Sequence, residues 1–255
     1  MKVIINPKYT ALENFIKNLP TRFEKLTEYE LLRNGRNRIV RCRVVDGYGL
    51  VIKSYGNPSF INSIVYGTLR QSKAMRAYYN AMRLLRLGIN TPEPVALVEV
   101  RSSGRLASSY FVSLDSEYTP LPAKAPYCSK DFCQMLDSLA SFIIRLHDLG
   151  IIHNDLNPSN ILYRRDESNG GYEFQIVDNN RMRFKSRLTL QDRFNDLRHF
   201  SSDDMPYLCM LHRYATLLDV ERREVNELRG VIARYKLLMR SNMKNKIKGR
   251  ISLKL

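Results

Sequence analysis

Short runs of β-branched and other apolar residues, separated by turn residues, occupy the first half of the chain. Residues 39–45 and 50–53 flank an Asp-Gly turn at 46–47, which predicts an antiparallel hairpin. Two further strands are predicted at 95–100 and 109–114, joined by a Ser-Ser-Gly turn. The first half is therefore expected to be rich in β-structure.

Other stretches place apolar residues three and four positions apart, the spacing of one helix face. This pattern predicts a helix over 72–88, ending at a C-cap glycine, and a strongly amphipathic helix over 132–146. Beyond residue 190 the chain is expected to be helical and basic. A proline-rich stretch at 119–126 is the expected linker between two lobes.

The N-terminal residues 1–25 also predict a short helix. Thr10 and Glu13 have the spacing of a capping box, and Pro20 is expected to stop the helix. The resulting fold class is α+β, with a β-rich lobe at 1–118 that holds one main helix. A mostly helical lobe is expected at 119–255, with an active site in the cleft between them.

Composition narrows the class of protein. The chain has 255 residues, with 41 Lys and Arg against 25 Asp and Glu, a formal charge of +16. No apolar run reaches the roughly 18 residues of a membrane helix, and no secretory signal pattern is present, so we expect a soluble intracellular protein. The spacing of its four cysteines fits neither a zinc site nor a disulfide framework, which favours reduced and mostly buried thiols. The positive charge calls for a polyanionic partner.

The most informative stretch is 151–162, where the amphipathic helix leads into a polar loop that contains Asp155 and Asn160. An apolar strand follows the loop, and a second apolar strand ends at Asp178. Carboxylate and amide oxygens are hard ligands, and Mg²⁺ that is bound together with substrate phosphates uses few protein ligands. These three side chains are typical of such a site.

The pattern H-x-D-x-x-x-x-N at 153–160, with D-N-N at 178–180, resembles the catalytic loop and metal-binding turn of the protein-kinase-like fold. L-V-I-K at 50–53 resembles the strand whose lysine holds the nucleotide phosphates. Asn157, where serine/threonine kinases carry Lys, and L-G-I-N-T-P-E-P at 87–94 are similar to the lipopolysaccharide core kinases (Kdo and heptose kinases). The resemblance covers roughly residues 5–200 and is more specific for the fold than for the substrate.

The resemblance implies a role for each residue of the motif. Asp155 would be the catalytic base, and Asn160 and Asp178 would hold Mg²⁺, or Mn²⁺ in its place. Lys53 would pair with the ATP phosphates, and His153 would support the loop. Asn157, a neutral side chain, would reach the transferred phosphate more weakly than Lys.

Two positions depart from the kinase pattern. No Asp or Glu lies between Lys53 and Glu93, and the position where kinases carry the helix glutamate that pairs with Lys53 falls near Tyr79. The glycine-rich loop is reduced to one glycine within 34–37. Both losses affect nucleotide positioning, whereas the base and the metal ligands are retained.

The expected activity is transfer of the ATP γ-phosphate to a sugar hydroxyl of a lipopolysaccharide-type glycolipid. Three alternatives stay open: an atypical protein or small-molecule kinase, a pseudokinase scaffold that lacks the helix glutamate, and a nucleic-acid-binding module. The kinase motifs make nucleic acid the weaker interpretation. The acid-free basic stretch 228–255 is either a solvated helix or a contact with the anionic inner face of the cytoplasmic membrane.

Overall fold

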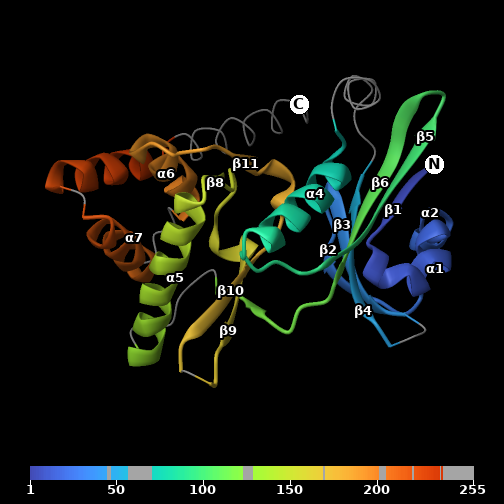
Figure 1. Cartoon of the computed structure of the whole chain (residues 1–255), viewed down its shortest axis with the longest axis horizontal. Helices are drawn as coiled ribbons and strands as arrows, with labels where there is room; N and C mark the ends of the chain where they lie inside the picture. The colour runs from blue at the N-terminus through green and yellow to red at the C-terminus, as the bar shows by residue number, and fades with distance from the viewer. Residues whose placement is uncertain are drawn as a thin grey trace, which may run out of the picture. The chain divides into compact units, whose positions relative to one another are not determined.

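A computed structural model describes most of the chain (Figure 1). The described residues are 1–44, 47–56, 71–122, 129–168, 170–200, 205–219, 221–235 and 237. The chain divides into unit 1, Met1–Glu117 with Gln175–Arg181, and unit 2, Tyr118–Phe174 with Met182–Leu255. The segment Gln175–Arg181 groups with unit 1 although we expected it in the C-terminal lobe, because its hydrogen bonds go to residues 80–91.

Unit 1 is built on a six-stranded sheet in which the described strand pairs are antiparallel. The order across the sheet is β1 (Lys2–Ile5), β5 (Pro94–Ser102), β6 (Arg105–Leu114), β4 (Gly49–Tyr55), β3 (Asn37–Arg43) and β2 (Glu30–Arg33). The predicted hairpin is confirmed as β3 and β4, paired from Asn37–Tyr55 to Arg43–Gly49. The edge strands β1 and β2 were not predicted.

Different helices pack against the two faces of this sheet. Leu50 and Ile52 of β4 pack into a core with the N-terminal helical segments, whereas Tyr55 packs with helix α4 (Lys73–Arg86). Figure 1 shows α1 and α2 on one side of the sheet and α4 on the other. Because successive side chains of a strand point to opposite faces, Lys53 lies on the α4 face with Tyr55.

The prediction for the N-terminal segment is wrong in detail. After β1 the chain forms a 3₁₀ turn capped by Asn6, then α1 (Glu13–Lys17) and α2 (Leu19–Arg22). Thr10 does not cap a helix, and Pro20 lies in the first turn of α2 instead of ending one. Proline is tolerated there because the first amides of a helix have no partner inside it.

Helix α4 agrees with its prediction. Ser72 caps its N-terminus by accepting a hydrogen bond from the Met75 amide, and Gly88 follows its end with φ of +71°. The helix buries Ala74, Ala77 and Tyr78 against the sheet. Small residues at two of these positions allow a close approach of α4 to the sheet, where it contacts β5 and β6.

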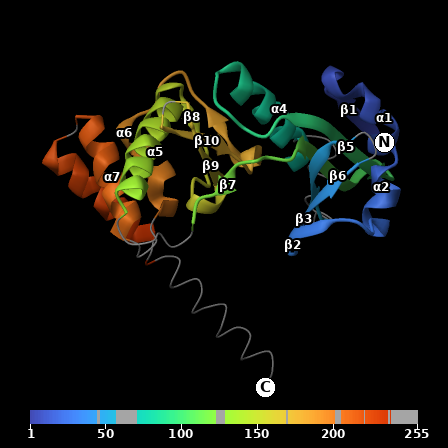
Figure 2. The same cartoon turned by 90° about the horizontal axis from the view of Figure 1, so that it is seen from below.

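Unit 2 is mainly helical, as expected. Its long helix α5 (Lys130–Asp148) packs against α7 (Met205–Leu217), as Figures 1 and 2 both show. Between them in the chain lie β8 (Ile151–Ile152), β9 (Ile161–Arg165), β10 (Tyr172–Ile176), β11 (Arg183–Phe184) and α6 (Leu190–Leu197). A further helical stretch spans 222–235. Part of the predicted linker forms β7 (Thr119–Pro120), which pairs with β9.

Two predictions fall partly outside the described residues. The basic stretch 228–255 is described only at 228–235 and 237, so its contact with a membrane stays a prediction. Cys42 is buried, but Cys133 and Cys209 are exposed, which corrects the expectation of mostly buried thiols; Cys128 is not described. Across the described ranges, no helix combines the length and apolarity needed to cross a bilayer.

Gly150 controls the path from α5 into the polar loop. It has φ of +74°, and its carbonyl accepts a hydrogen bond from the Lys185 amide at 2.8 Å. A Cβ atom at this position would lie 1.8 Å from the Lys185 carbonyl oxygen. Only glycine therefore fits between α5 and β8.

We expect Gly150→Ala to lower the free energy of unfolding by about 3 kcal/mol, measured by urea denaturation. The left-handed backbone alone costs an alanine about 1–2 kcal/mol, and the backbone clash adds to it. Gly170→Ala is the matched control, because Gly170 has φ of +69° but no atom within 4 Å of its Cβ position. Equal losses in the two variants would show that the contact with Lys185 has no effect.

Candidate active site

In unit 1, the buried Lys53 makes a short ion pair with Asp178. Lys53 Nζ lies 2.6 Å from Asp178 Oδ1, and the two side chains are 10% and 19% exposed. The Lys53 ammonium also lies over the ring of Tyr55, 5.3 Å from its centroid. Burial, followed by the Asp178 charge, holds the pKa of Tyr55 well above its usual value, so its hydroxyl stays neutral. The missing helix glutamate is thus replaced by Asp178 as the partner of Lys53.

The turn that carries Asp178 is held by hydrogen bonds to α4 and to the segment after it. Asn80 Nδ2 of α4 donates to the Asn179 carbonyl at 2.7 Å, and the hydroxyl of Thr91 donates to the Ile176 carbonyl at 2.7 Å. Asn179 Nδ2 donates to the Thr91 hydroxyl at 3.0 Å. Asp178 itself has φ of +63°, a conformation that needs such support from its surroundings.

Positive side chains of unit 1, Lys53 among them, gather around Lys73. The pKa of Lys73, in the first turn of α4, is lowered first by burial and then by the charges of Arg36, Arg181, Arg76 and Lys53. Lys73 and Arg76 are one turn apart and therefore share a face of α4. This side of unit 1 consequently has the electrostatics of a binding site for a polyanion.

In unit 2, the loop after β8 carries Asp155 and is organised around its backbone carbonyl. Asn160 Nδ2 donates to that carbonyl at 2.8 Å, and Asn157 Nδ2 donates to it at 2.9 Å. Asn157 Oδ1 accepts hydrogen bonds from the amide and hydroxyl of Ser159, so Asn157 caps the following 3₁₀ turn. Asn157 therefore stabilises the loop, and its expected contact with a phosphate stays a prediction.

A buried aspartate of α6, Asp196, stabilises the same loop by accepting hydrogen bonds from its backbone. Asp196 Oδ2 accepts the His153 amide at 2.8 Å, and Oδ1 accepts the Asn154 amide at 2.6 Å. His147 Nε2 lies 3.4 Å from Asp196, and His147 Nδ1 lies 2.6 Å from the hydroxyl of Tyr214. Asp196 therefore connects α5, α6 and α7 to the loop. Burial works to raise its pKa, but the hydrogen bond and charge of His147 together with His153 bring it below the usual value.

The donor atoms of Asn160 and Asp178 suit a hard divalent cation. The Asn160 amide nitrogen is used in the hydrogen bond to Asp155, which leaves the amide oxygen as the ligand atom. Lys53 and Asn180 both bond Oδ1 of Asp178. Within the ranges that the structure describes, no three His, Cys, Asp or Glu side chains lie together as a metal cluster. Each of the two side chains, taken in its own unit, offers an oxygen atom of the kind that Mg²⁺ prefers.

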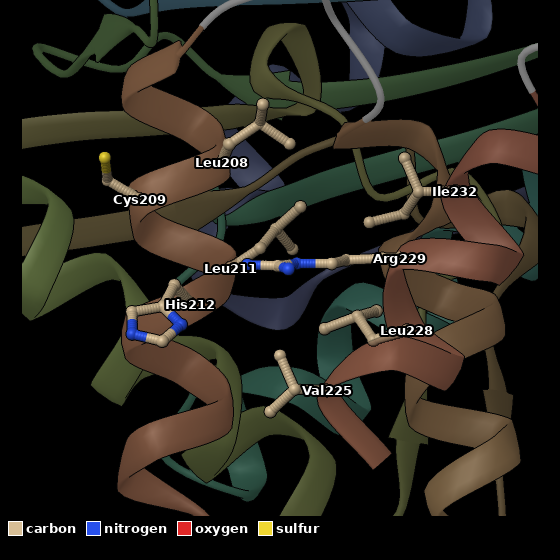
Figure 3. A pocket seen from close by; sticks show the side chains of 8 residues that line it. All are labelled: Leu208, Cys209, Leu211, His212, Val225, Leu228, Arg229 and Ile232. Atoms are coloured by element: carbon tan, nitrogen blue, oxygen red, sulfur yellow. The ribbon is translucent and has the colours of Figure 1, made fainter. Parts of the chain in front are cut away.

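A cavity of about 510 Å³ lies in unit 2 between α7 and the 222–235 helix (Figure 3). It is lined by Leu208, Cys209, Leu211, His212, Val225, Leu228, Arg229 and Ile232. Figure 3 shows mainly aliphatic side chains facing one another across it. Since its lining includes no carboxylate or amide side chain, this cavity does not contain the donors of the motif residues.

Three supporting residues were missed by reasoning from the sequence. Asn80 and Thr91 bond the Asp178 turn, and Asp196 bonds the Asp155 loop. Thr91 lies in the 87–94 motif that was noticed only as a family feature. Asp196, between apolar neighbours Phe194 and Leu197 on α6, could have been found as a carboxylate on a buried helix face.

Comparisons with known proteins agree with this architecture. No curated protein matches the chain by sequence. The solved structure "WaaP in complex with acyl carrier protein" superposes with a TM-score of 0.61 at 16% identity, covering 94% of this chain and 99% of that one. An aminoglycoside-3'-phosphotransferase of type VIII superposes with a TM-score of 0.54 at 14% identity, covering 86% and 98%. These likenesses confirm the kinase-like α+β fold.

The family model "Lipopolysaccharide kinase (Kdo/WaaP) family" matches residues 57–228. This match covers more than half of the chain, and it includes the Asp155 loop and the Asp178 turn. The chain therefore belongs to the lipopolysaccharide kinase (Kdo/WaaP) family and is a phosphotransferase.

Proposed function

We propose that this kinase transfers the γ-phosphate of ATP to a sugar hydroxyl of a lipopolysaccharide-type glycolipid. In this proposal Asp155 is the catalytic base, and Lys53 binds the nucleotide phosphates. Asn160 and Asp178 are the proposed ligands of Mg²⁺. The observation that carries the nucleotide assignment is the buried 2.6 Å contact between Lys53 and Asp178.

The cationic surroundings of Lys53 support the assignment of the nucleotide to unit 1. Lys73 is depressed in pKa by burial and by neighbouring positive charges, so these side chains repel one another when no anion is bound. A triphosphate would relieve that repulsion. Mg²⁺, when bound, would neutralise phosphate charge that develops during transfer.

The loop geometry supports Asp155 as the group that receives the acceptor proton. The hydroxyl oxygen of the sugar forms a bond to the γ-phosphorus while the bond from that phosphorus to the ADP oxygen breaks. The hydroxyl proton goes to the Asp155 carboxylate. Asn157 and Asn160 hold the loop by donating to the backbone carbonyl of Asp155, and Asn157 Nδ2 also lies 3.4 Å from Oδ1 of the carboxylate.

The proposed acceptor also suggests where in the cell this enzyme acts. An anionic glycolipid and the membrane that contains it would both attract the basic stretch 228–255, so we place the enzyme at the inner face of the cytoplasmic membrane. The similar WaaP structure holds an acyl carrier protein, which makes such a carrier a candidate partner of this chain.

Ligand-dependent thermal unfolding tests the nucleotide site. We expect millimolar ATP with Mg²⁺ to raise the melting temperature of the wild type by about 5 °C or more, if ATP reaches 100 times its dissociation constant. ATP without Mg²⁺ should give a smaller rise. Lys53→Ala and Asp178→Asn should each lose most of the rise, since each removes one half of the 2.6 Å pair.

Lys8→Ala is the matched control, because Lys8 is an exposed lysine of unit 1 that pairs with Glu93 at 2.8 Å. It should keep the full rise. Absence of any shift in the wild type at millimolar Mg-ATP, or a full shift in Lys53→Ala, would contradict the proposed nucleotide site. Transfer of radiolabelled phosphate to lipopolysaccharide, compared with casein and an aminoglycoside, then tests the acceptor class.

A further inference from the structure

A histidine outside the kinase motifs lies beside the Asp155 carboxylate. His199 belongs to the 3₁₀ turn Arg198–Phe200 that follows α6, and its side chain is only 13% exposed. Its Nδ1 atom lies 3.8 Å from Asp155 Oδ1. Its Nε2 atom is buried and has no hydrogen-bond partner within the part of the chain that the structure describes. Nδ1 is therefore the ring nitrogen on the side of Asp155, in contact with that carboxylate but beyond hydrogen-bond distance from it.

The helical stretch 222–235 also contacts this histidine, through Tyr235. The hydroxyl of Tyr235 lies 2.9 Å from His199 Nδ1, and the two rings are 4.8 Å apart in an edge-on arrangement. The guanidinium of Arg198 lies over the Tyr235 ring, 5.8 Å from its centroid. One imidazole thus joins the last described helix to the loop that carries Asp155.

The charge state of His199 suits a neighbour of a catalytic base. Burial, followed by the positive charge of Arg198, lowers the pKa of His199, with a smaller contribution from His153. The charges of Asp155 and Asp196 act in the opposite direction without reversing the shift. A neutral imidazole leaves the negative charge of Asp155 intact, whereas a permanent cation at this distance would make the carboxylate a weaker base.

We propose that His199 is a positioning residue for Asp155, and that Tyr235 holds the His199 ring in place. The imidazole limits the movement of the Asp155 carboxylate on its Oδ1 side, so that the base keeps one orientation toward the acceptor hydroxyl. Small displacements of a catalytic group reduce the rate steeply, by about 10²-fold for 1 Å. This inference rests on the proposed function of Asp155 as the base.

Steady-state kinetics of full-length variants test the positioning role. His199→Ala should lower kcat for phosphate transfer from ATP to lipopolysaccharide roughly tenfold and leave the KM for ATP within about twofold, as expected for a misplaced base. Tyr235→Phe, which removes one hydroxyl, should lower kcat by a smaller factor. Asparagine at position 199 can place an amide where Nδ1 lies, whereas glutamine reaches the Nε2 position. His199→Asn should therefore retain more activity than His199→Gln.

A second measurement does not depend on the acceptor. The imidazole resonance of His199 can be titrated by NMR in the wild type and in Asp155→Asn. Since the Asp155 carboxylate raises the pKa of His199, its loss should lower that pKa further. An unchanged His199 titration in Asp155→Asn would show that the two side chains do not interact and would overturn the inference.

Arg234→Ala, an exposed change next to Tyr235, is the control and should retain full activity. Normal kcat in His199→Ala beside an inactive Asp155→Asn would overturn the inference alone. Full activity in Asp155→Asn would overturn both the inference and the assignment of the base. Equal activity of the Asn and Gln variants would also count against positioning through Nδ1, because a purely structural role does not distinguish these two amides.

Discussion

Asp155→Asn should lower kcat for phosphate transfer to lipopolysaccharide by about 10³-fold, within the range that general-base catalysis contributes. The substitution keeps the size of the side chain and removes its ability to accept a proton. The fold should be unaffected, because the hydrogen bonds from Asn157 and Asn160 reach the backbone carbonyl of residue 155. The Mg-ATP shift in melting temperature should remain, since the nucleotide is assigned to unit 1.

Asp166→Asn is the matched control for this result. Asp166 lies in the turn after β9, where its Oδ1 accepts hydrogen bonds from the amide and hydroxyl of Ser168 at 3.0 and 2.6 Å, and an asparagine oxygen can accept both. This variant should retain wild-type activity. A kcat for Asp155→Asn within a few-fold of the wild type would exclude Asp155 as the base.

Asp196→Ala should lower the free energy of unfolding by about 3–5 kcal/mol, the cost of removing one partner from a buried charged network. The variant leaves the His153 and Asn154 amides and the His147 ring without their acceptor. Urea denaturation followed by circular dichroism measures the loss. Activity should fall as well, because these amides begin the loop that carries Asp155.

Asp192 of the same helix provides the control for Asp196. It forms a capping box with Thr189 and a surface ion pair with Lys185, so Asp192→Ala should cost only about 1–2 kcal/mol. If Asp196→Ala does not fold, Asp196→Asn gives the milder test, because an amide has one acceptor oxygen for two amide donors. A loss no larger than that of Asp192→Ala would show that the buried network does not stabilise the protein.

Because its pKa is lowered in the folded protein, the contribution of Asp196 to the free energy of unfolding depends on pH. The folded protein holds Asp196 ionised below the pKa that the unfolded chain has. Its stabilising effect is therefore complete above the ordinary aspartate pKa and is lost as the pH falls through the lowered value. The difference in stability between wild type and Asp196→Ala should shrink over that acidic range.

The parts of the fold that sequence reasoning predicted are those specified by local pattern. The β3–β4 hairpin, α4 and α5 have strong periodicity and clear turn or cap residues. The failures have local causes as well. The exposed edge strand β2 lacks an alternating apolar face, and Asn6 rather than Thr10 caps the N-terminal turn.

The candidate site was predicted only as far as its motifs extend along the chain. The loop spacing pointed to Asp155 and Asn160, but their roles remain proposals. The partner of Lys53 lies 125 residues away in sequence, a pairing that no local spacing can reveal. His199 was missed for the same reason, since it meets Asp155 and Tyr235 only in the folded protein.

In many kinases, swinging the main helix of the small lobe breaks or forms an ion pair with the strand lysine and so switches the enzyme off or on. Here α4 contains no Asp or Glu. Its Asn80 side chain instead donates a hydrogen bond to a backbone carbonyl of the Asp178 turn. A rotation of α4 would therefore act on the Lys53–Asp178 pair through this hydrogen bond to the turn, and not through a carboxylate of its own.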